Sequence, residues 1–130
     1  MKDKLNVAQK GYDLLMLLAI SDKHYHEKEA QKILEFIKRH YHVKTLHATS
    51  LTYFEELSEE KRLEELIKCA EAFEHSTQEN KNLMIEFVFG VIFADRKFAS
   101  QEKSRFKILE RFWDFNLKSY IDKMEEERGR

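Results

Sequence analysis

Hydrophobic and polar positions follow a helical period over most of the chain. Leu14–Ile20 is apolar on every side, which is typical of a helix buried at the centre of a domain. Further along, Ile33, Phe36 and Ile37 stand at i, i+3 and i+4, the spacing of one buried helix face. The pattern predicts an all-α fold, a compact bundle of about six to seven helices.

Capping residues and polar breaks divide the chain into these helices. Ser58 and Thr77 are good N-caps for the helices that follow them. The expected helices cover about 5–21, 26–41, a short segment ending at 57, 58–75, 78–94, 100–115 and 117–127. Gly90 falls inside one of them, where glycine costs about 1 kcal/mol relative to alanine. We expect another helix to approach closely there, and Trp113 and the ten phenylalanines to fill the core.

Composition supports one helical domain. The chain has 130 residues, no proline and three glycines, and proline and glycine are the residues that most disfavour helix interiors. Its formal net charge is −1 and it has no long basic stripe, so no nucleic-acid partner is expected. The apolar run Leu83–Ala94 is well short of the roughly 18 residues of a membrane span.

Cysteine usage favours a reducing compartment. Cys69 is the only cysteine, so the chain cannot form an internal disulfide, and a cytoplasmic location is expected. Its neighbours in the sequence "LIKCAEAF" are mostly apolar. We therefore expect Cys69 to pack as a small hydrophobic residue.

Two segments share a pattern, "SDKHYHEKEA" (Ser21–Ala30) and "ADRKFASQEK" (Ala94–Lys103). Each follows an apolar helix and leads into an amphipathic one. The aligned carboxylates are Asp22 with Asp95 and Glu29 with Glu102. The repeat predicts two pseudo-symmetric helical hairpins, about 5–41 and 78–115, followed by a C-terminal helix and tail at 117–130. All of these lie in one domain, 1–130.

The aligned carboxylates carry the candidate chemistry. If the two turns meet, four carboxylates converge, and such oxygen ligands suit Mg²⁺, Ca²⁺ or Mn²⁺. In the alternative, each Asp and Glu closes its own turn, and Lys23 and Arg96 neutralise them. Both alternatives stay open. His24 and His26 have no histidine counterparts in the second copy, so neither belongs to the shared pattern.

Other catalytic and metal-binding motifs are absent from the sequence. Neither turn has the ligand spacing or the glycine of an EF-hand, and "HEKEA" lacks the second histidine of a zinc protease motif. The chain has neither a glycine-rich phosphate loop nor a nucleophile elbow. We therefore expect no enzymatic activity.

At these repeated turns the chain resembles the TerB-like (tellurite resistance protein B) family. "FADRKFASQE" (Phe93–Glu102) is the closer copy and "ISDKHYHEKE" (Ile20–Glu29) the looser one. The resemblance implies an all-α domain of roughly seven helices, with a shared divalent-cation site formed by the acidic residues of both turns. It also implies a link to tellurite and other chemical stress, and no catalysis. Lys23 and Arg96 stand where the family has glycine.

The sequence therefore predicts a cytoplasmic, stress-associated domain with a divalent-cation site formed by Asp22, Glu29, Asp95 and Glu102. The alternative is a metal-free module that binds a protein partner through a helix face.

Overall fold

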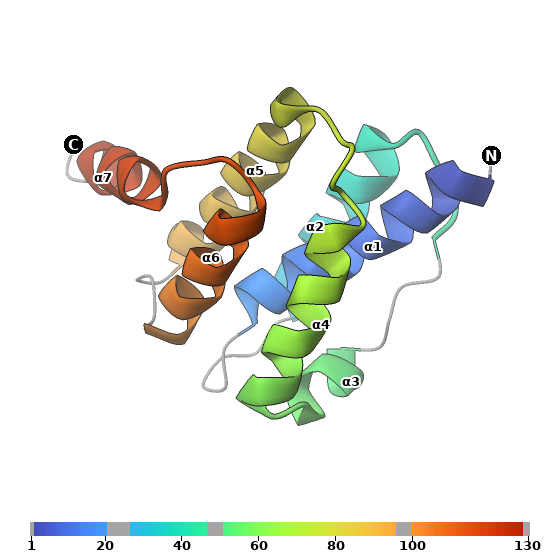
Figure 1. Ribbon diagram of the computed structural model, residues 1–130, viewed down its shortest axis with the longest axis horizontal. Helices are drawn as coiled ribbons and strands as arrows, with labels where there is room; N and C mark the ends of the chain where they lie inside the picture. Colours follow the sequence, from blue (N-terminus) through green and yellow to red (C-terminus); the bar gives the residue numbers. More distant parts are fainter. Residues whose placement is uncertain (1, 21–26, 47–50, 96–99, 129–130) are drawn as a thin grey trace.

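A computed structural model describes residues 2–20, 27–46, 51–95 and 100–128 (Figure 1). This part of the chain forms seven helices and no strand, so the all-α prediction is confirmed. The helices are α1 (Lys2–Ala19), α2 (Glu27–His40), α3 (Leu51–Glu56), α4 (Glu59–Glu71), α5 (Gln78–Asp95), α6 (Ser100–Phe112) and α7 (Leu117–Arg128).

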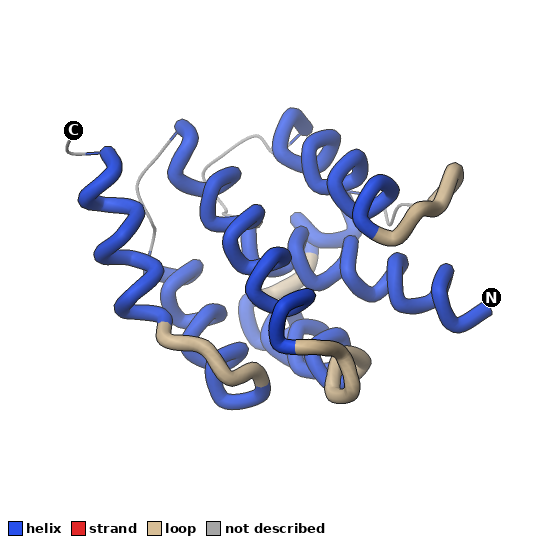
Figure 2. Tube along the Cα trace, turned by 90° about the horizontal axis from the view of Figure 1, so that it is seen from above, coloured by secondary structure: helices blue, strands red, loops and turns tan. Residues whose placement is uncertain are grey.

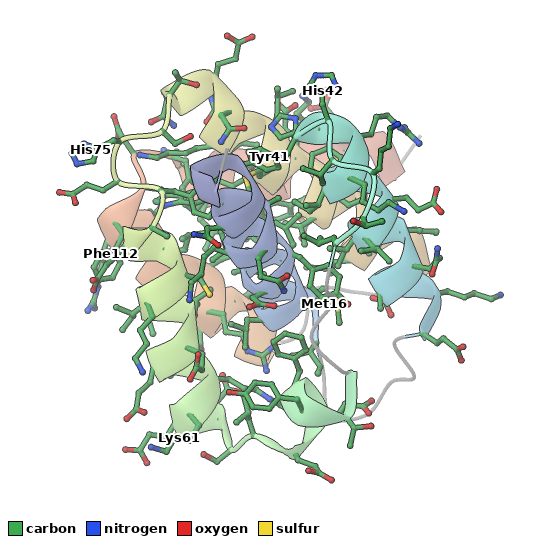
Figure 3. The ribbon with its side chains drawn as sticks, turned by 90° about the vertical axis from the view of Figure 1, so that its right-hand side faces the viewer. Met16, Tyr41, His42, Lys61, His75 and Phe112 are labelled. Carbon is green, nitrogen blue, oxygen red and sulfur yellow. The ribbon has the colours of Figure 1, made fainter. Side chains whose placement is uncertain are left out.

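Helix α1 forms the centre of the bundle, as its apolar end predicts. It contacts α2, α4, α5 and α6, and every residue of Leu14–Ile20 is buried. Figures 1 and 3 show α2 and α4 on opposite sides of α1. Helix α7 packs on α5 and α6 and lies at one edge of the bundle (Figure 2). No helix of the described residues has the length and apolar character needed to cross a membrane.

The predicted N-caps start their helices as expected. The Ser58 hydroxyl accepts a hydrogen bond from the Lys61 amide at 3.2 Å, and the Thr77 hydroxyl accepts one from the Asn80 amide at 3.1 Å. Helix α4 ends at Glu71, four residues earlier than predicted. The amides of residues 72–74 bond to the carbonyls three residues before them, so this terminus tightens into a 3₁₀-type turn.

The expectation that another helix lies close to Gly90 is wrong. Gly90 is exposed, and an added Cβ atom would meet no heavy atom within 4 Å. The close approach is at Gly11 instead. A Cβ there would lie 3.1 Å from Ile37 Cδ1 and 3.4 Å from both Met84 Cε and Phe73 Cζ. Periodicity predicts which residues share a face, but it does not tell which face another helix approaches.

Trp113 lies in the core as predicted, together with Phe54, Phe73, Phe89 and Phe106. Trp113 is buried, its indole donates to the Ala70 carbonyl at 3.3 Å, and Phe73 packs edge-on against it. Phe112 does not follow the prediction. Its side chain is 44% exposed, and Figure 3 shows it on the outer side of the bundle.

Candidate functional site

The four carboxylates predicted to hold a cation belong to the α1–α2 turn and the α5–α6 turn. Asp22 lies outside the described residues, as do the side chains of Asp95 and Glu102. Glu29 is described: it lies in the first turn of α2 and is buried. Among the side chains that are described, no group of three or more His, Cys, Asp or Glu residues is placed to hold a metal. The convergence of the four carboxylates therefore stays a prediction.

The segments flanking the two turns are in direct contact. Arg105, in α6, donates through Nη1 to the Leu17 carbonyl at 3.2 Å and to the Ile20 carbonyl. Ile20 is two residues before Asp22, and Arg105 is three residues after Glu102. The end of α1 is therefore hydrogen-bonded to the first half of α6.

Arg105 is fully buried and makes an ion pair with Glu59. Its Nε and Nη2 atoms donate to the two carboxylate oxygens of Glu59 at 3.1 and 2.8 Å. Such a two-pronged arginine–carboxylate contact is among the stronger hydrogen-bonded pairs in proteins. The guanidinium also places positive charge at the C-terminus of α1, where it complements the helix dipole.

A second buried arginine shares the same carboxylate. Arg62 Nη1 lies 3.8 Å from Glu59 Oε1. Its Nε and Nη2 atoms donate to the carbonyls of Phe54 and Glu55 at 3.2 and 3.1 Å. Glu59 therefore connects α6 and the end of α1 to the segment around α3.

Sequence reasoning missed both arginines, although periodicity contains a signal for them. Arg105 stands at i relative to Leu109 at i+4 and Trp113 at i+8, which are both buried. Arg62 likewise shares a helix face with two buried residues, Leu66 at i+4 and Cys69 at i+7. An arginine on an apolar helix face is predicted to be buried, and a buried guanidinium needs an ion-pair or hydrogen-bond partner.

A polar junction fixes the end of α2 against the start of α5. His40 Nε2 donates to the Asn80 side-chain oxygen, and Asn80 Nδ2 donates to the Tyr41 hydroxyl at 3.3 Å and the Ser76 hydroxyl at 2.6 Å. Burial raises the pKa of Tyr41, and the hydrogen bond from Asn80 partly opposes this rise. The junction therefore sets the register in which α2 and α5 run antiparallel.

An open hollow follows this junction along the surface between α2 and α5; we call it the α2–α5 groove. The Phe36 and Phe87 rings stack at its centre, with centroids 4.1 Å apart and planes 8° apart. The His40 ring also stacks with the Phe36 ring, with centroids 5.3 Å apart. The hollow has a volume of about 530 Å³, and its lining residues are Lys28, Gln31, Lys32, Glu35, Phe36, Arg39 and Phe87.

Cys69 packs as the sequence predicts. It is buried, and burial, reinforced by the charge of Asp13, raises the pKa of its thiol to about 12. A thiol with this pKa is almost entirely protonated at neutral pH, whereas the thiolate is the nucleophilic form. Cys69 is therefore a core residue.

Comparison with known families decides the classification of the chain. Residues 9–116 match the family described as tellurite resistance protein TerB. The chain belongs to the TerB family. The match covers both predicted acidic turns of this TerB domain and ends just before α7. Comparisons with curated proteins and with solved structures gave no match.

Proposed function

We propose that this TerB domain is a non-catalytic, tellurite-resistance-associated module of the cytoplasm that holds a divalent cation between its two acidic turns. Its ligands would be the carboxylates of Asp22, Glu29, Asp95 and Glu102, which suit Mg²⁺, Ca²⁺ or Mn²⁺. The observation that carries the proposal is the hydrogen bond from Arg105 to Ile20, because it joins the segments that flank the two turns.

Electrostatics supports a cation at this place. Carboxylates that converge repel one another, and a bound cation removes that repulsion. Glu29 is 4% exposed and lies in the first turn of α2, so this carboxylate is held at the buried start of its helix.

Thermal unfolding with and without added metal tests the proposal. A ligand at one hundred times its Kd stabilises the folded state by about 2.7 kcal/mol, so a bound ion should raise the Tm by several degrees. We expect this rise with Mg²⁺, Ca²⁺ or Mn²⁺, and we expect its loss in Asp22→Asn/Asp95→Asn. The matched control is Asp114→Asn/Asp122→Asn, which removes two exposed carboxylates outside the turns. No rise with any ion, or an equal rise in the turn variant, would refute the cation site.

A second candidate function is that of a metal-free module that binds a protein partner through a helix face. The α2–α5 groove favours it, because two stacked phenylalanines are partly exposed to solvent there. Half-exposed aromatic residues in a surface hollow are typical of binding sites.

A further inference from the structure

The α2–α5 groove combines an apolar floor with a basic edge. Lys28, Lys32, Phe36 and Arg39 follow one another on α2 at i, i+4, i+8 and i+11, which places them along one stripe of the helix. Phe36 lies between Lys32 and Arg39 on this stripe and stacks on Phe87. The two aromatic rings are therefore flanked by cations in both directions along the groove.

The charge of this edge is unbalanced. It carries three cations and one carboxylate, Glu35, whose Oε1 accepts a hydrogen bond from Gln31 at 3.1 Å. Within the described part of the chain, no carboxylate forms an ion pair with Lys28, Lys32 or Arg39. From Lys28 to Arg39 the stripe extends about 16 Å at 1.5 Å per residue. A single phosphate or carboxylate cannot contact cations spread over that length, whereas three turns of an acidic helix can.

The α5 side of the groove is open. Leu83, Phe87 and Gly90 stand at i, i+4 and i+7, so they share one face of α5. Leu83 is 44% exposed, and no atom lies within 4 Å of the position of a Cβ on Gly90. Glycine disfavours a helix interior, and within the described residues no neighbour requires it here. Its lack of a side chain lets another backbone approach α5 next to Phe87.

We propose that the α2–α5 groove binds an acidic amphipathic helix of a partner protein. Apolar residues on one face of that helix, spaced at i and i+3 or i+4, pack on Phe36 and Phe87 and reach Leu83. Asp and Glu residues beside that face lie opposite Lys28, Lys32 and Arg39, and the helix backbone passes close to Gly90. This is the helix-in-groove mode of recognition, with the basic edge selecting acidic partners.

The proposal deepens the second candidate function and rests on it, but it does not require the cation. The groove is formed by side chains of α2 and α5 and includes none of the four carboxylates of the predicted cation site. Experiments on the groove are therefore done in EDTA, so that loss of metal binding and loss of peptide binding are separate results.

Selection from a displayed library tests the occupant directly. The probe is a phage library of 16-residue helical peptides in which all surface positions vary, selected on the immobilised chain at 50 mM salt. We expect the enriched peptides to be acidic, with apolar residues at i, i+4 and i+7 or a closely related spacing. An enriched peptide carrying a fluorophore then gives the Kd by fluorescence anisotropy.

Matched variants locate the binding surface. Lys28→Glu/Lys32→Glu reverses two charges of the groove, and we expect a Kd about tenfold weaker. Lys68→Glu/Lys107→Glu makes the same change of net charge on exposed residues of α4 and α6, and we expect a Kd within about twofold of the wild type. Gly90→Gln adds a polar side chain to the open face, where its Cβ meets no atom within 4 Å, and we expect this variant to fold and to bind at least about fivefold more weakly.

Each of the other outcomes would overturn the proposal. No enrichment above the starting library would refute the groove as a helix site. Neutral or basic peptides, or equal losses in both double-lysine variants, would refute acidic recognition at this edge. Binding to phosphatidylglycerol vesicles without any peptide selection would assign the groove to an anionic membrane surface instead.

Discussion

Arg105→Met keeps the length and apolar stem of a fully buried side chain but removes its guanidinium. The change leaves Glu59 without its two-pronged partner and leaves the Leu17 and Ile20 carbonyls without a donor from α6. Removing one member of a buried ion pair costs about 3–5 kcal/mol. The Glu59 side chain is 34% exposed, so water replaces part of the lost interaction. We therefore expect the free energy of unfolding to fall by about 3 kcal/mol, the low end of that range.

Urea unfolding followed by far-UV circular dichroism measures this loss. Arg111→Met is the matched control, since Arg111 is an exposed arginine of the same helix and its removal should change stability by less than about 0.5 kcal/mol. Arg105→Lys keeps the charge but not the planar fork, so its stability should lie between those of the wild type and Arg105→Met. If Arg105→Met and Arg111→Met unfold at the same urea concentration with equal slopes, the buried pair does not stabilise the fold and the reasoning fails.

Three further predictions concern stability. Gly90→Ala should raise the free energy of unfolding by about 0.5–1 kcal/mol, because its Cβ meets nothing within 4 Å. Gly11→Ala should lower the free energy of unfolding, because a Cβ 3.1 Å from Ile37 Cδ1 overpacks the core at a cost of about 1–3 kcal/mol, which outweighs the roughly 0.5–1 kcal/mol that alanine gains in a helix. Urea unfolding in which Gly90→Ala and Gly11→Ala both raise, or both lower, stability would contradict this. Stability should also fall as pH rises above 9, since the folded state keeps the proton of the Cys69 thiol, whose pKa is raised to about 12, while the unfolded state loses it. This one group lowers the free energy of unfolding by at most about 1.4 kcal/mol per pH unit. In urea unfolding at pH 8–10, the free energy of unfolding of Cys69→Ala should therefore depend less on pH than that of the wild type. An equal pH dependence of the two proteins would exclude the thiol as the cause.

Local signals in the sequence predicted most of the fold. The Ser58 and Thr77 caps depend on residues three positions away, and the burial of Leu14–Ile20 follows from an uninterrupted apolar run. The pairing of Arg105 with Glu59 could not be predicted in the same way, because it joins residues 46 positions apart. For the same reason, the contact between Phe36 and Phe87 could not be predicted, because these stacked residues stand 51 positions apart.

The candidate cation site was predicted from the repeated turns, and only part of it lies in the described structure. Glu29 is buried at the start of α2, as a ligand or a helix-capping residue would be. Asp22 lies outside the described residues, as do the side chains of Asp95 and Glu102, so their meeting stays a prediction. What the structure adds is Arg105, which brings the flanking segments together although nothing in the repeat indicated it.

The central position of α1 has a consequence for how the chain folds as it is synthesised. Helix α1 is complete at residue 19, but its partner α6 is complete only at residue 112. Ribosomes add about 5–20 residues per second, so roughly 5–20 s pass between these two points. During that time Leu14–Ile20, which are all buried in the finished domain, stay partly exposed to solvent. Of the seven described helices, the one made earliest is thus among the last to be fully enclosed, and the nascent chain is most prone to aggregate before α6 emerges.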